Sequence, residues 1–173
     1  MTSDINEFRR VMGHFATGVS IVTTKMNGEY HGLTVNSLTS VSLDPLLILV
    51  NVSVYADSHD LIKESGVFAV NFLALEQEHL SRRFADPEIE DRFKDLETWE
   101  GESGAPILKD NMAYIDCKVW NSVKAGDHTI FIGEVIGHKV VKPEASPLLY
   151  YRGNYADIIA RSPEDPSKQV PRE

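Results

Sequence analysis

The chain has 173 residues, of which 42% are hydrophobic and 25% are charged, and its formal net charge is −9 at pH 7. This length is enough for one domain that buries its own core without metal or disulfide cross-links. The negative charge argues against a sequence-independent nucleic-acid binder, which needs a basic surface. No segment has the roughly 18 consecutive apolar residues that span a bilayer, so we expect a protein that binds neither nucleic acid nor membrane.

The N-terminus and the rare residue types exclude further classes of protein. Residues 1–4 are polar and acidic and lack the pattern of a secretory signal, which predicts a cytoplasmic protein. The single cysteine, Cys117, excludes an intrachain disulfide, and its place in an alternating strand pattern predicts a small buried side chain. The six histidines are scattered without metal-binding spacing, so we expect no metal site.

The first elements in chain order are a short helix and a β-hairpin. Asp4 and Glu7 resemble a capping box, and the apolar spacing after them predicts a helix that ends before Gly18. Asn27-Gly28 is typical of a type I′ turn, which requires positive φ at both positions. It predicts a hairpin with strands at 19–24 and 30–35.

The rest of the chain predicts strands with a few short helices between them. The expected elements are a strand buried on both faces at 46–52, a helix at 58–64, a strand at 67–73, a helical region broken at Pro87 at 76–93, a loop at 99–110, long strands at 112–124 and 129–141, and a short strand at 147–151. Because strands dominate without regular βαβ alternation, we predict a mainly β fold, an antiparallel barrel with short peripheral helices. The C-terminal tail, 161–173, is expected to be mobile.

The segment 34–42 is rich in hydroxyl groups and free of charge. It can be simply a half-exposed edge strand. Alternatively, its hydroxyls and backbone N–H groups can face a phosphate or the edge of a heteroaromatic ring, where Asn36 adds an amide that both donates and accepts. Neither of the common glycine-rich phosphate-binding motifs occurs in the chain, so an anionic ligand has to be held by local groups of this kind.

Three other motifs have both a structural and a functional interpretation. Gly126-Asp127-His128 is a hairpin turn, or it places a histidine at the mouth of a ligand site. Arg82-Arg83 ends a helix, where cations favour the helix dipole, or it binds a phosphate. The aromatic segment 150–155 is core and rim, or it stacks on a planar ring. No G-x-S-x-G motif is present, which argues against a serine hydrolase of the nucleophile-elbow type.

Five stretches match one family in order: FATGVSIVTT at 15–24, GLTVNSLTSVSLDP at 32–45, SGVFAVNFL at 65–73, GDH at 126–128 and PLLYYRGNY at 147–155. Between them they extend over nearly the whole chain, from about residue 6 to 158. The ordered set resembles the short-chain flavin reductase family, and within it the 4-hydroxyphenylacetate 3-monooxygenase reductase type. These are split-barrel reductases of two-component flavin-dependent monooxygenases.

The resemblance implies one FMN-binding split β-barrel, antiparallel and Greek-key-like, over residues 1–160. It also implies a homodimer with the flavin near the subunit interface. The flavin-contacting positions that it implies are Thr34, Val35, Asn36, Ser37, Leu38, Ser40, Val41, Ser42, Asn51, Val52, Ser53, Ser58, Arg83 and Phe84. The positions that it implies for the nicotinamide are His128, Tyr151, Arg152, Gly153 and Tyr155. Asp57 departs from the family, which often has Lys or more Ser and Thr near that position, close to the expected phosphate.

The implied activity is hydride transfer from NADH or NADPH to FMN, or to FAD. Because the cofactor performs this chemistry, no catalytic side chain is expected. Reduced flavin would then diffuse to a partner oxygenase. The alternatives are a flavoredoxin-like electron carrier or a ferric reductase with tightly bound FMN, and, in another class, a non-catalytic flavin-binding protein.

Overall fold

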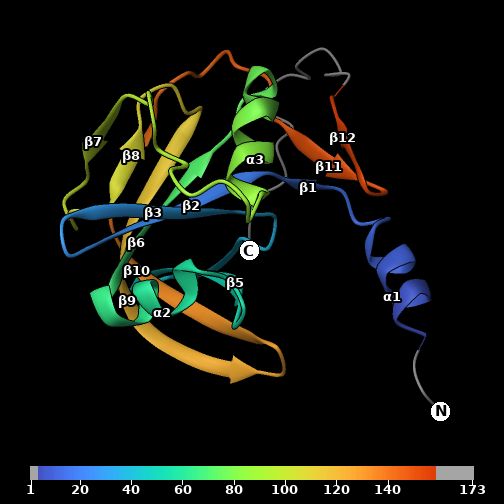
Figure 1. Cartoon of the computed structure of the whole chain (residues 1–173), viewed down its shortest axis with the longest axis horizontal. Coiled ribbons are helices and arrows are strands. Elements are labelled where there is room, and N and C mark those ends of the chain that lie inside the picture. The colour runs from blue at the N-terminus through green and yellow to red at the C-terminus, as the bar shows by residue number, and fades with distance from the viewer. Residues whose placement is uncertain (1–3, 159–173) are drawn as a thin grey trace.

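The computed structural model describes residues 4–158, so the expected mobile tail at 161–173 lies outside the described residues. The fold is mainly antiparallel β, with three short α-helices at its periphery (Figure 1). The helices are α1 (Ile5–Met12), α2 (Ser58–Ser65) and α3 (Glu78–Ala85), with a 3₁₀ turn at Leu75–Gln77. The strands are β1 (Thr17–Gly18), β2 (Ser20–Met26), β3 (Glu29–Val35), β4 (Thr39–Leu43), β5 (Leu46–Ser53), β6 (Val67–Phe72), β7 (Thr98–Glu100), β8 (Pro106–Leu108), β9 (Ala113–Ala125), β10 (His128–Val140), β11 (Leu149–Tyr151) and β12 (Asn154–Ala156).

Seven of these strands form the main sheet in the order β3-β2-β6-β9-β10-β5-β4. The chain leaves β5 through α2 and re-enters the sheet at β6, beyond the later strands β9 and β10, which is a Greek-key-like crossing. The sheet curls around a core that includes Val50, Phe68 and Phe131, and its edge strands β3 and β4 do not pair with each other. The prediction of a mainly β, antiparallel split barrel is confirmed, with the barrel open between these edges.

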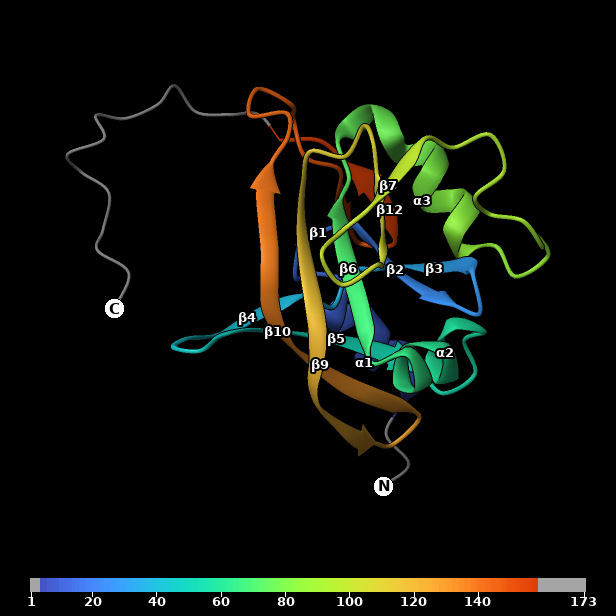
Figure 2. The ribbon, with the colours of Figure 1, turned by 90° about the vertical axis from the view of Figure 1, so that its left-hand side faces the viewer.

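Two long hairpins give the sheet its shape. Asn27 and Gly28 have φ angles of 52° and 86°, as the expected type I′ turn between β2 and β3 requires. The β9–β10 hairpin turns at Gly126, which has φ 66°. Figure 2 shows this hairpin running the height of the molecule and the β4–β5 hairpin projecting from it to one side. Cys117 on β9 is fully buried, which confirms its predicted place in the core.

The expected loop at 99–110 instead contains the hairpin of β7 and β8. Two buried polar side chains from the main sheet hold this hairpin. The Thr23 hydroxyl donates to the Pro106 carbonyl at 2.5 Å, and the Leu108 N–H donates to Asn71 Oδ1 at 2.8 Å. The prediction of a loop was wrong because each strand has only three residues, too few to show an alternating pattern.

The expected helical region at 76–93 is helical only in its first half. α3 ends at Ala85, and the segment after Pro87 is a loop whose carbonyls at Asp91 and Lys94 accept hydrogen bonds from Arg83. The short strand β12 was not predicted at all. Its partner β11 lies only a Gly153 turn away, so the pair is too short to show an alternating pattern.

The N-terminal helix is shorter than expected and stands off the body of the molecule (Figure 1). The Asp4 carboxylate accepts from the N–H groups of Asn6 and Glu7, which starts the helix as predicted. The helix ends at Gly13, whose carbonyl accepts a hydrogen bond from the Arg152 N–H at 2.8 Å. Its large apolar side chains remain exposed, including Phe8 at 63%. No helix of the described residues is long and apolar enough to cross a membrane.

Candidate functional site

The largest cavity that we describe, about 970 Å³, lies between α1 and the body of the protein. It is lined by the last turn of α1, the segment through β1 into β2, the connection between β3 and β4, Asn51 of β5, and the region of β11 and its turn. Its volume is at the upper end of the roughly 300–1,000 Å³ typical of small-molecule sites. The cavity is therefore large enough for a nucleotide.

The β3–β4 connection is fixed to β5 by one side chain. The Ser37 hydroxyl donates to the Asn51 carbonyl at 3.1 Å and accepts from the Asn51 N–H at 3.0 Å. The register of β4 against β5, in which Thr39 faces Leu49, places Ser37 opposite Asn51 if it is continued by two more residue pairs. The serine side chain thus replaces the backbone partner that β4 no longer supplies, and the connection is fixed against the cavity.

The polar groups of the cavity are few and mostly uncharged. Asn36 donates from Nδ2 to the Thr17 hydroxyl at 3.2 Å, which closes one corner. The Oδ1 atom of Asn51 is buried and has no hydrogen-bond partner among the described residues. Because buried polar atoms are usually paired with protein, water or a ligand, this oxygen is a candidate acceptor for a ligand donor. Among residues 4–158, the only charged side chain in the lining is Arg9.

The walls of the cavity are apolar. They include Phe8, Met12 and Phe15 from the N-terminal segment, Leu38 after β3, and Tyr150 of β11. Apolar walls with a few placed polar groups are the usual composition of a small-molecule or cofactor site. The residues present fit a flavin: the walls can cover the ring, and the side-chain amides can meet its polar edge.

The expected flavin positions separate into three groups in the structure. Four of them, Asn36, Ser37, Leu38 and Asn51, line the large cavity. Ser40 and Ser42 line a second, smaller cavity of about 310 Å³ between the β4–β5 hairpin and the start of β9, while Val41 is exposed. The remaining positions are Thr34, Val35, Val52, Ser53, Ser58, Arg83 and Phe84.

This third group has mostly structural contacts. Val35, Val52 and Phe84 are buried in the core. Thr34 donates to the Ser81 carbonyl at 2.6 Å, and Arg83 donates to the loop after α3. Ser58 is buried at the start of α2, and Ser53 is paired with His128 across the β5–β10 ladder. These residues do not line the large cavity, and their contact with flavin stays a prediction.

Asp57, the departure from the family, has a cationic partner. Its carboxylate lies 3.3 Å from a guanidinium nitrogen of Arg92, whose side chain is 15% exposed. Arg92 also donates to the Asp86 carbonyl, so the guanidinium joins the loop after α3 to the turn before α2. The negative charge of Asp57 is balanced by this pair.

The expected nicotinamide positions lie in two separate places (Figure 1). His128 is at the tip of the β9–β10 hairpin, where its Nδ1 lies 2.8 Å from Asp127 Oδ1, and this contact lowers the pKa of the Asp127 carboxyl. Tyr151, Arg152, Gly153 and Tyr155 are on β11, β12 and the turn between them, and of these Gly153 lines the large cavity. Within one chain, His128 and the segment 151–155 therefore do not form a single site.

Sequence reasoning missed the contribution of α1 to the cavity. The spacing of its apolar residues identified an amphipathic helix, and such a helix normally packs against the core of its own chain. In the structure none of its residues is buried, and Phe8, Arg9 and Met12 line the cavity. The high apolar content of so short a terminal helix was the available signal.

Known proteins share both the sequence and the fold. The flavin reductase PheA2 has a TM-score of 0.84 and 43% sequence identity, over 91% of this chain and 99% of that one. The NADH:FAD oxidoreductase SgcE6 of Streptomyces globisporus, solved with NAD and FAD fragments, has a TM-score of 0.83 and 37% identity, over 96% and 97%. The reductase subunit HsaB of a flavin-dependent monooxygenase from Rhodococcus jostii is 38% identical over 170 residues, 97% of this chain and 82% of that protein.

Together with the cavity, these likenesses define the class as an oxidoreductase that reduces flavin. The model of the family described as "Flavin reductase like domain" matches residues 12–158. The chain belongs to this family, as its ordered motifs predicted.

Proposed function

We propose that the protein binds FMN, with FAD as the alternative flavin, in the large cavity and reduces it with NADH or NADPH. This assignment rests on one observation: the segment 36–38, which was predicted to contact flavin, lines the same cavity as Asn51, whose buried Oδ1 has no hydrogen-bond partner within residues 4–158. Bound flavin supplies the hydride acceptor. The task of the chain is to hold the ring, exclude water with the apolar walls, and present side-chain amides to the polar edge.

The proposal extends to a homodimer. Its support is the exposed apolar surface of α1 and of the segment that follows it, where Ile5, Phe8 and Phe15 are each more than 60% exposed, since contiguous apolar surface marks interaction sites. A second copy also offers a way to unite His128 with the segment 151–155 around one nicotinamide. Analytical ultracentrifugation tests the dimer, and a monomer at micromolar concentration would contradict it.

The proposed partner is a flavin-dependent oxygenase that receives diffusing reduced flavin. The support is the relationship to HsaB, which is the reductase subunit of such a system. A cytoplasmic location follows from the need for reduced nicotinamides, and cell fractionation tests it. We further propose that the flavin-binding unit is a single domain, as predicted for residues 1–160.

Steady-state oxidation of NADH and of NADPH, with and without added FMN, FAD or riboflavin, tests the activity. Turnover that requires added flavin, with reduced flavin recovered across a dialysis membrane, is the expected result. Turnover with a flavin that stays bound and reduces ferric iron would favour the electron carrier or ferric reductase. If the protein binds flavin but oxidises neither NADH nor NADPH, the result would favour a non-catalytic flavin-binding protein.

A further inference from the structure

Arg9 contributes a positive charge to the lining of the large cavity. Every other lining residue in the described part of the chain is uncharged, and none of them is a carboxylate. The whole chain carries a net charge of −9, so its overall field repels an anionic ligand. An anion that enters this cavity therefore depends on a local cation, and Arg9 is the one that the lining provides.

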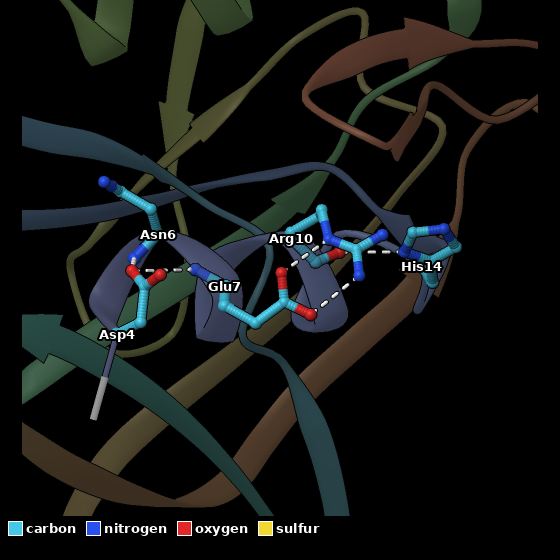
Figure 3. A network of polar contacts seen from close by, with 5 residues as sticks. All are labelled: Asp4, Asn6, Glu7, Arg10 and His14. Carbon is cyan, nitrogen blue, oxygen red and sulfur yellow. Dashed lines mark hydrogen bonds and ion pairs between the residues drawn. The ribbon is translucent and has the colours of Figure 1, made fainter. Parts of the chain in front are cut away.

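The charge of Arg9 is not neutralised by the helix that carries it. Figure 3 shows the polar network of α1, in which Arg10 donates two hydrogen bonds of 2.7 Å to the Glu7 carboxylate. The Asp4 carboxylate caps the helix, so both acidic groups of this segment already have partners. Arg9 is exposed and forms no ion pair or side-chain hydrogen bond with the residues at 4–158.

The backbone holds Arg9 in a defined place relative to the cavity. Its carbonyl accepts from the Gly13 N–H at 2.9 Å, and the Gly13 carbonyl accepts from the Arg152 N–H at 2.8 Å. The last turn of α1 is thus attached to the turn between β11 and β12, one helical turn after Arg9. A Cβ at Gly13 would lie 3.5 Å from the Arg152 Cα, which shows how closely the two backbones approach.

We propose that Arg9 is the phosphate-binding residue of this cavity, holding a phosphate ester of the nucleotide that binds there. A guanidinium matches phosphate geometry with paired donors, and its charge strengthens the hydrogen bonds. This inference rests on the proposed function, which places a nucleotide in the cavity. The phosphate belongs either to the flavin or to the nicotinamide dinucleotide, and the two sources are separable by experiment.

The test compares full-length wild type with Arg9→Gln, Arg9→Lys and Arg10→Gln. Dissociation constants for FMN and riboflavin are measured by quenching of flavin fluorescence, and KM is measured for NADH and for N-benzyl-dihydronicotinamide, which has no phosphate. Arg10→Gln is the matched control, because it removes the same charge from the neighbouring position outside the cavity. Melting temperatures equal to wild type verify that each variant folds.

If the phosphate is that of flavin, Arg9→Gln raises the Kd of FMN about tenfold or more and leaves that of riboflavin within twofold. If the phosphate is that of the dinucleotide, the KM of NADH rises by a similar factor while that of the benzyl analogue is unchanged. Arg9→Lys retains part of the effect, and Arg10→Gln changes none of these values.

Equal losses for the ligands with and without phosphate, or no loss for any ligand, would overturn the role of Arg9. The proposed function fails separately. A wild type that binds no flavin contradicts it and this inference together, whereas a flavin-binding wild type with an unaffected Arg9→Gln variant contradicts the inference alone.

Discussion

The hydroxyl of Ser37 lies between the N–H and the carbonyl of Asn51 and makes a hydrogen bond with each. A side chain thereby continues the β4–β5 ladder beyond the last backbone pair. The same contact fixes the segment that carries Asn36 and Leu38 along one wall of the cavity. We therefore assign Ser37 to holding the wall in place, because both hydrogen-bonding functions of its hydroxyl are engaged by the protein.

Substitution Ser37→Ala leaves two backbone groups of β5 without their partner. We expect the free energy of unfolding to fall by about 1–2 kcal/mol, since the groups are only partly buried and water can reach them in part. Urea unfolding measures the change. Ser40→Ala is the control, because Ser40 is exposed and its hydroxyl makes no hydrogen bond within residues 4–158. An equal loss in both variants would contradict the role of Ser37.

Asn51 and Asn111 each have a buried Oδ1 without a hydrogen-bond partner in the described part of the chain, but of the two only Asn51 lines the cavity. Asn51→Ala should weaken flavin binding about tenfold with little loss of stability, because it removes an unpaired oxygen. Asn111→Ala should do the reverse, because its Nδ2 donates to Asn71 Oδ1 in the buried network that holds β8. Fluorescence titration and urea unfolding of both variants measure the two effects. The assignment fails if both variants bind flavin equally well.

Gly133 has no room for a side chain. A Cβ there would lie 2.5 Å from the Phe68 ring and 2.8 Å from the Cys117 Cβ. Gly133→Ala should therefore destabilise the protein by about 1–3 kcal/mol through overpacking. Gly18→Ala is the matched comparison, because a Cβ there has nothing within 4 Å. Thermal unfolding of both variants measures the difference. Equal melting temperatures would contradict the prediction and would mean that the core around β10 adjusts to the added methyl group.

Cys117 should be inert in the native protein, because burial raises the pKa of its thiol to about 12. Iodoacetamide at pH 8.5 is expected to alkylate the urea-unfolded chain and to spare the native one, as mass spectrometry will show. Rapid alkylation of the native protein would mean that β9 opens easily.

The same thiol links stability to alkaline pH. In the unfolded chain it ionises near pH 9, whereas in the folded chain it keeps its proton up to about pH 12. Its contribution to stability is complete below about pH 8.5 and is lost as the pH rises toward 12, with a slope of up to about 1.4 kcal/mol per pH unit. Urea unfolding between pH 8 and 11 should show this slope in wild type and a shallower one in Cys117→Ala.

His128→Ala tests the nicotinamide assignment at the tip of the β9–β10 hairpin. We expect a raised KM for NADH with little change in the Kd of FMN, because His128 lies outside the lining of the large cavity. Lys124→Ala, on the same hairpin, is the control. Unchanged kcat and KM in His128→Ala would remove this residue from the nicotinamide site.

The sequence by itself determined the features that depend on neighbours along the chain. Asn27-Gly28 has the turn geometry that its residue types require, Asp4 starts α1, and Gly66 ends α2 with a φ of 70°. The ordered motifs were sufficient to place the chain in its family. Local conformational preferences and a shared ancestry are both written in short stretches, so they can be read without coordinates.

Only the tertiary structure decided which partners the polar side chains have. Thr23 donates to the Pro106 carbonyl, 83 residues further on, and this contact holds the β7–β8 hairpin, which looked like a loop in the sequence, against the main sheet. Arg83 donates to the Lys94 carbonyl in the loop after α3 and Phe84 packs in the core, and neither contact was visible in the sequence. Arg9 lines the cavity because it lies on α1, a helix that has no buried residue and so does not pack into the core of the chain. Such contacts depend on how distant segments pack, and no local pattern of residues records that.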